Sequence, residues 1–68
     1  MRLKELRIPL DEIEFLLDQY VYNVRNKTIF LQKLEGYTYE ELADMYKLTA
    51  VRIKGIVKEC YDIISMHF

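Results

Sequence analysis

Two threonines, Thr38 and Thr49, each stand where a helix can begin, and this pair constrains the fold of the chain more than any other feature. Thr38 precedes Glu41 by three residues, which is the spacing of a capping box, where the two residues exchange hydrogen bonds between side chain and backbone. Gly36, just upstream, suits a turn or the end of an earlier helix. Thr49 offers a second N-cap. The sequence therefore predicts two consecutive helices, one after each threonine.

The spacing of the apolar residues agrees with two helices joined by about three residues. A stripe at i, i+3, i+4 and i+7 predicts a short helix over 39–46, from Tyr39, Leu42, Ala43 and Tyr46. A longer helix is predicted from Ala50 to about Met66. Its inner face would hold Ile53, Ile56, Val57, Cys60, Ile63 and Ile64, and its outer face Val51, Lys54, Gly55, Lys58 and Asp62. This arrangement predicts a helix-turn-helix over about 38–66, whose second helix is the natural one to enter a DNA major groove.

The N-terminal half also has a helical period. Pro9 can begin a helix whose first turns carry acidic residues, and its apolar stripe would be Ile13, Leu16, Leu17, Tyr20, Val21 and Val24. A further helix is predicted over about 26–35, capped by Asn23 or Asn26, unless the two helices run on as one. His67 is expected to lie in a frayed end.

No segment alternates like a strand, so we expect an all-α fold, a four-helix small domain of residues 1–68 with a C-terminal helix-turn-helix. The segment over about 9–35 would serve as helical support or for dimerisation. A single cysteine excludes an internal disulfide, and one histidine beside it makes a zinc site improbable. No nucleophile motif or phosphate loop is present, so we expect no cofactor, no metal, no catalytic residue and no enzyme activity.

The charge of the chain is unevenly distributed. The net charge is −1, yet residues 10–22 contain four acidic side chains and no basic one, whereas residues 45–58 contain Lys47, Arg52, Lys54 and Lys58 and no acidic one. This asymmetry is typical of a small groove-reading domain, although a solvated helix face gives the same pattern. The charged N-terminus lacks an apolar signal-peptide core and no apolar run could span a membrane, so we expect a cytoplasmic protein.

The segment LEGYTYEELADMYKLTAVRIKGIV, residues 34–57, resembles region 4 of bacterial sigma factors, especially the extracytoplasmic-function type. The resemblance extends back to about Arg25 and forward to about Lys58, which is half of the chain. It implies that the last helix binds the −35 promoter element and that earlier helices contact RNA polymerase. By position, Thr49 and Lys58 would contact phosphates, and the residues facing the groove or the DNA backbone would be Ala50, Val51, Arg52, Lys54 and Gly55.

Three departures from the family matter. Lys47 stands where the family often has a turn glycine, and a left-handed lysine would cost roughly 1 kcal/mol. Ala50 and Val51 replace polar base-reading residues, so direct reading would rest on Arg52 and Lys54. Region 2 is absent, so the chain resembles a free-standing region 4-like regulator of the kind found in phages and mobile elements.

Three readings follow for the partners. The first is a regulator that binds double-stranded DNA, as a homodimer through the first helix or together with RNA polymerase. The 51% apolar content, high for so small a domain, favours such a protein contact. The second is a protein-binding module that contacts RNA polymerase or another regulator without reading DNA. The third is the DNA-recognition part of a phage packaging subunit.

Overall fold

The computed structural model describes residues 8–67, and this part of the chain folds into four α-helices without a strand. They are α1 (Leu10–Tyr20), α2 (Val24–Glu35), α3 (Tyr39–Tyr46) and α4 (Ala50–His67). The all-α fold with four helices is confirmed. The prediction that the N-terminus lacks a signal peptide rests mainly on residues 1–7, which lie outside the described part.

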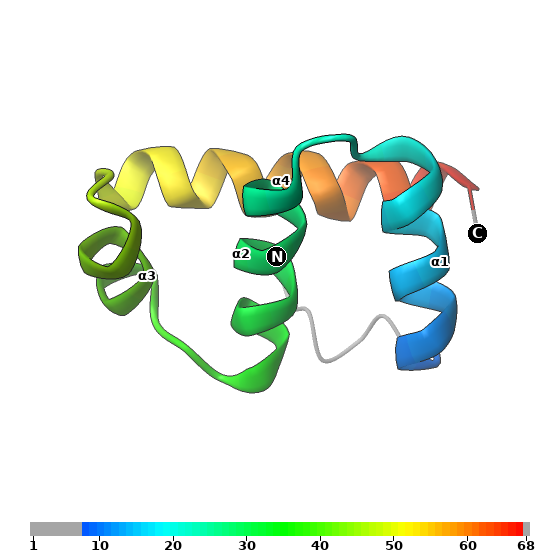
Figure 1. Ribbon diagram of the computed structural model, residues 1–68, viewed down its shortest axis with the longest axis horizontal. Coiled ribbons are helices and arrows are strands. Elements are labelled where there is room, and N and C mark those ends of the chain that lie inside the picture. The colour runs from blue at the N-terminus through cyan, green and yellow to red at the C-terminus, as the bar shows by residue number, and fades with distance from the viewer. Residues whose placement is uncertain (1–7, 68) are drawn as a thin grey trace.

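The three shorter helices lie side by side against the long helix α4 (Figure 1). Helix α3 packs at the N-terminal end of α4, α2 packs at its middle, and α1 packs near its C-terminal end. The chain therefore advances from one end of α4 to the other before α4 itself runs back past all three. Figure 1 shows the other helices on one side of α4, and no other helix of residues 8–67 covers the opposite side.

The junction between α1 and α2 differs from the prediction of one long apolar stripe. Helix α1 ends at Tyr20, and Val21 continues in extended conformation with φ −117° and ψ 105°. Asn23, not Asn26, caps α2, because its side chain accepts a hydrogen bond from the Asn26 backbone N–H at 3.2 Å. The separate cap starts α2 at Val24, two residues earlier than predicted, and leaves this valine 69% exposed rather than in the core.

The predicted capping box at the start of α3 is confirmed. The Thr38 hydroxyl accepts from the Glu41 N–H at 3.1 Å, and the Glu41 carboxylate accepts from the Thr38 N–H at 2.9 Å. Gly36 ends α2 in the left-handed conformation, with φ 116°, as its place before the cap predicts. A cap of this kind stabilises a helix by roughly 1 kcal/mol, which matters for a helix of only eight residues.

Helices α3 and α4 are joined by residues 47–49. Lys47 adopts the left-handed conformation, with φ 55°, so the expected strain of a lysine at this position is present. The predicted N-cap of α4 is confirmed, because the Thr49 hydroxyl accepts from the Arg52 N–H at 3.1 Å. The expectation for His67 is wrong: this residue belongs to α4 and stacks on Tyr20, with ring centroids 3.7 Å apart.

The core forms where α1, α2 and α3 meet the inner face of α4. Every residue of the predicted inner face is buried except Ile63, which is half buried. Phe30 and Ile29 of α2, Leu17 of α1 and Leu42 of α3 fill the space opposite, and all four are at most 1% exposed. No polar or charged side chain is buried within residues 8–67. Within the same residues, no helix is both long enough and apolar enough to cross a membrane.

Candidate nucleic-acid interface

The outer face of α4 is free of the rest of the described chain. Val51 is 78% exposed, and Arg52, Lys54, Gly55 and Lys58 are all exposed as well. A Cβ added at Gly55 would meet no atom within 4 Å, so the glycine leaves open space above the helix rather than accommodating a neighbour. The first two turns of α4 therefore offer a convex surface that can enter a groove.

The cations of this surface lie on both flanks of the helix. Arg52 and Lys54 are two residues apart, which places them ~200° apart around the α4 axis. Val51 and Gly55 fall between them on the outward side. The exposed surface thus has a small, uncharged centre with a cationic side chain on either side, and Lys58 extends this surface one turn further along α4.

The beginning of α4 adds backbone donors. The hydroxyl of Thr49 caps the Arg52 N–H, and the Thr49 carbonyl accepts from the Ile53 N–H at 3.0 Å. The amides before Arg52 have no intrahelical acceptor, because the first turn of any helix lacks one. Exposed amides at the positive end of a helix attract anions. Ala50 is half buried, so its side chain faces the protein more than the positions around Val51 do.

The side chain of Lys54 contacts an aromatic ring of α3. The Lys54 ammonium group lies 5.4 Å from the centroid of Tyr39, and Lys33 of α2 lies 4.4 Å from the same centroid. Such cation–π contacts are worth about 0.5–1 kcal/mol at exposed sites. The Lys33 ammonium group also donates to the Tyr37 carbonyl at 3.0 Å, which ties the end of α2 to the loop before α3.

An open groove of about 450 Å³ runs beside this ring, lined by Tyr39, Lys54, Lys58, Tyr61 and Asp62. It joins α3 to the middle of α4, next to the exposed surface described above. The Lys58 ammonium group lies 2.8 Å from the Asp62 carboxylate, and this hydrogen bond raises the pKa of Lys58 above its ordinary value of 10.5, with a further contribution from the charge of Asp62. Lys58 is therefore charged, but it already has a partner within α4.

The eight residues predicted from the sequence are distributed as follows. Val51, Arg52, Lys54, Gly55 and Lys58 share the exposed surface of α4, Thr49 caps the same helix, Ala50 is half buried beside it, and Lys47 lies exposed in the turn before it. Lys33, Tyr39 and Tyr61 were not predicted as part of the site. Tyr39 fitted the core stripe of its own helix, and nothing local in the sequence indicates that lysines from two other helices meet its ring.

Cys60 belongs to the core and not to this surface. It is 2% exposed, and burial raises the pKa of its thiol from 9.0 to about 11, with a smaller contribution from Glu59. Its sulfur lies 3.9 Å from the Asn26 carbonyl oxygen, which it can reach as a weak donor. Within residues 8–67, no three His, Cys, Asp or Glu side chains gather closely enough to hold a metal ion.

Comparison with known proteins finds no counterpart for this chain: no family model matches it, and neither does a curated protein or a solved structure.

Proposed function

We propose that the chain is a DNA-binding transcriptional regulator of the sigma region 4-like type, in which α3 and α4 act as a helix-turn-helix. The observation that carries this proposal is the exposed outer face of α4, where Val51 and Gly55 lie between Arg52 and Lys54. A helix with an uncharged ridge and a cation on either flank matches a groove whose floor is formed by bases and whose two walls carry phosphates.

In this arrangement the two flanking cations hold opposite walls of the major groove. Arg52 would reach phosphates on one strand and Lys54 those on the other, while the first amides of α4 and the Thr49 hydroxyl would meet a phosphate at the helix end. The Thr49 oxygen accepts a hydrogen bond from Arg52, and its O–H remains able to donate. Because Arg52 and Lys54 lie on the two flanks of α4, they would bind the DNA backbone in this arrangement. The sequence alone had predicted that these two residues read the bases.

In this arrangement the bases would be contacted by the two uncharged residues between the cations, Val51 and Gly55. Val51 can contact a thymine methyl group, and Gly55 lets the helix backbone approach the bases closely. Neither residue can form the bidentate hydrogen bonds that distinguish guanine or adenine. We therefore expect binding that depends strongly on salt and weakly on DNA sequence, with preference for thymine-containing sites.

The test is a titration of the protein against a random duplex at low and moderate salt. Lys54→Glu and Lys58→Glu should each weaken binding at least tenfold at low salt, because each replaces an attraction to phosphate by a repulsion. The matched control is Arg25→Glu, which makes the same change in net charge on an exposed residue at the start of α2. Circular dichroism should show unchanged helicity for all three variants.

The same titration addresses the second candidate function, a protein-binding helix-turn-helix module that contacts RNA polymerase or another regulator. The observation that favours this candidate is the pairing of Lys58 with Asp62. A lysine that already has a carboxylate partner is less available to bind a DNA phosphate. Absence of binding at low salt, or equal loss in the Arg25→Glu control, would reject the DNA-binding proposal and leave the protein partner.

A further inference from the structure

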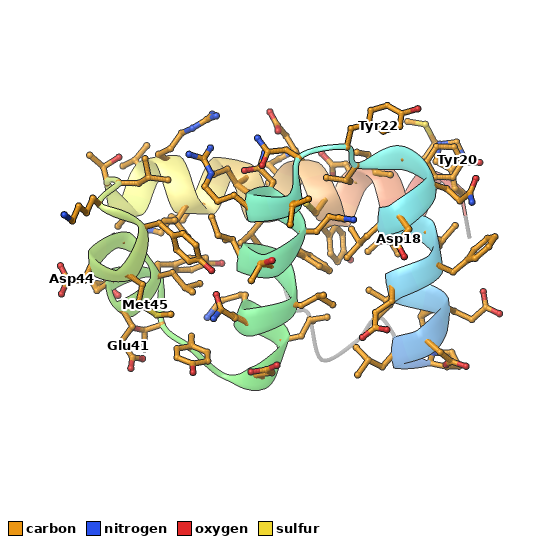
Figure 2. The ribbon with its side chains drawn as sticks, in the orientation of Figure 1. Asp18, Tyr20, Tyr22, Glu41, Asp44 and Met45 are labelled. Atoms are coloured by element: carbon orange, nitrogen blue, oxygen red, sulfur yellow. The ribbon has the colours of Figure 1, made fainter. Side chains whose placement is uncertain are left out.

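A second exposed surface lies at the other end of α4. Figure 2 shows Tyr20 and Tyr22 together at this end, far from Glu41, Asp44 and Met45 of α3. Tyr20 stacks on His67 of α4 with the two rings 5° from parallel. Tyr22 is 88% exposed and Met66, next to His67 in the chain, is 77% exposed. We call Tyr20, Tyr22, Met66 and His67 the aromatic end.

The stacked pair fixes the shape of this surface. Tyr20 is the last residue of α1, and His67 is the last residue of α4, so the ring contact joins the ends of two helices. Tyr22 follows in the three-residue connection to α2, which is not helical. The aromatic end is therefore held in place from two elements, although 44% of Tyr20 and most of Tyr22 and Met66 remain exposed.

The charges beside the aromatic end are balanced within the molecule. Asp18, two residues before Tyr20 on α1, lies 2.8 Å from the Lys27 ammonium group. Asp62, one turn before Met66 on α4, lies 2.8 Å from the Lys58 ammonium group. Two copies of this surface can therefore face each other without placing uncompensated like charges together.

The other exposed aromatic residue of α1 is surrounded differently. Phe15 is 57% exposed, but Asp11, Glu12 and Glu14 stand within four residues of it, and residues 10–22 contain no basic side chain. A symmetric contact places identical surfaces against each other, so a contact through Phe15 would bring these carboxylates of the two copies together. This argues against a dimer along the outer face of α1 and in favour of the aromatic end.

The length of α4 gives a further reason for a second copy. Met66 follows Gly55 by eleven residues of continuous helix, which is ~17 Å at 1.5 Å per residue. If the α4 helices of the two copies continued in one line from a contact at Met66, their two Gly55 residues would lie ~34 Å or slightly more apart, and adjacent half-sites on one face of a DNA duplex are separated by about 34–36 Å.

We infer that the aromatic end is the contact surface of a symmetric homodimer, formed by the same surface of a second copy of the chain. The self-association itself is independent of the proposed function, and only the spacing of the two α4 helices rests on it. Four side chains cover less than the ~800 Å² per partner of a standard interface. The free protein should therefore form a weak dimer, which a duplex carrying two half-sites would stabilise.

Sedimentation equilibrium without DNA tests the inference. The average mass of the unmodified protein should rise from 8.3 kDa toward twice that value across the micromolar to millimolar range. Tyr22→Glu and Met66→Glu should each keep the protein monomeric over the same range, since each buries a charge against its own copy. Phe15→Glu is the matched control and should leave the association unchanged. Circular dichroism checks that the variants are folded.

Two results would overturn the inference: a mass of 8.3 kDa for the unmodified protein at every concentration, or a dimer that survives both substitutions at the aromatic end. These outcomes are separate from the DNA-binding test, because Lys54→Glu changes neither the aromatic end nor the two ion pairs beside it. A protein that dimerises but binds no duplex would uphold the dimer and reject the proposed function. A protein that binds DNA only as a monomer would uphold the proposed function and reject the dimer.

Discussion

The ammonium group of Lys58 lies 2.8 Å from the carboxylate of Asp62, one turn further along α4. Both side chains are more than half exposed, and an exposed pair of this kind contributes little to stability because water and salt screen it. A phosphate could therefore take over Lys58 at little cost. Until it does so, Asp62 competes for the same cation and places a negative charge on the surface that we propose for DNA.

Asp62→Asn should therefore strengthen DNA binding. The substitution removes the competing carboxylate and leaves Lys58 available to a phosphate, so we expect roughly three- to tenfold tighter binding at low salt, with a steeper dependence on salt. Fluorescence anisotropy with a labelled duplex measures both quantities. Asp11→Asn is the control, since it makes the same change in net charge on α1. Equal gains from the two substitutions would mean that only the net charge matters.

Local sequence signals predicted the C-terminal half of the fold well. Thr38 and Thr49 cap the two helices that they were expected to cap, and the inner face of α4 is buried as its period predicts. These features depend on hydrogen bonds and side-chain spacing within a few residues. The C-terminal stack of His67 on Tyr20 could not be predicted in the same way, because it joins residues that are far apart in the chain.

The break between α1 and α2 was harder to predict for a physical reason. The apolar spacing continues through Val21 to Val24, and two asparagines, Asn23 and Asn26, compete for one cap. Periodicity alone cannot choose between a continuous helix and a break, since the choice depends on how α1 and α2 each dock on α4. For the candidate site the sequence supplied the cations of α4, whereas the ring of Tyr39 joined them only through the packing of α2 and α3.

Glu41 should make the stability of the protein depend on acidic pH. The hydrogen bond from the Thr38 backbone N–H lowers the pKa of Glu41 below its ordinary value of 4.5, and the Thr38 side chain adds to this effect. The stabilisation is therefore complete above pH 4.5 and is lost as the pH falls through the lower folded-state pKa. Urea unfolding of Glu41→Gln should show a weaker loss of stability below that pH than the unmodified protein.

Glu40→Gln is the control for this prediction, because Glu40 lies in the same turn of α3 outside the capping box. The stability of the Glu40→Gln variant should change with pH in nearly the same way as that of the unmodified protein. The stability of the Glu41→Gln variant should differ more from it. If the two substitutions reduce the loss of stability at acidic pH equally, the capping box is not the cause of that loss.

Lys47→Gly should stabilise the protein. Lys47 adopts a left-handed conformation, with φ 55°, which costs an ordinary residue about 1 kcal/mol and costs glycine almost nothing. Because glycine also loses more backbone entropy on folding, we expect a net gain of about 0.5 kcal/mol in the free energy of unfolding. Lys47→Ala removes the same side chain without relieving the strain and should give no gain. Equal effects of both substitutions in urea unfolding would contradict the explanation.

Cys60 should resist alkylation while the protein is folded. Burial raises the pKa of its thiol from 9.0 to about 11, so the reactive thiolate at pH 8 is roughly a hundredfold scarcer than for an ordinary cysteine. Reaction with iodoacetamide, followed by mass spectrometry, should be slow in buffer and fast in concentrated urea. Rapid modification of the folded protein would show that the helices around Cys60 open readily.

Gly55→Ala should separate stability from DNA binding. Alanine favours a helix by about 1 kcal/mol over glycine, and its added Cβ would meet no atom within 4 Å, so the free energy of unfolding should rise. In the proposed complex the same methyl group would stand between α4 and the bases, and we expect several-fold weaker binding to a duplex. Ser65→Ala provides the control, because it also exchanges an exposed residue of α4 for alanine, ten residues nearer the C-terminus. If Gly55→Ala stabilises the protein and leaves DNA affinity unchanged, the centre of the ridge does not touch DNA, and binding would have to use another part of α4.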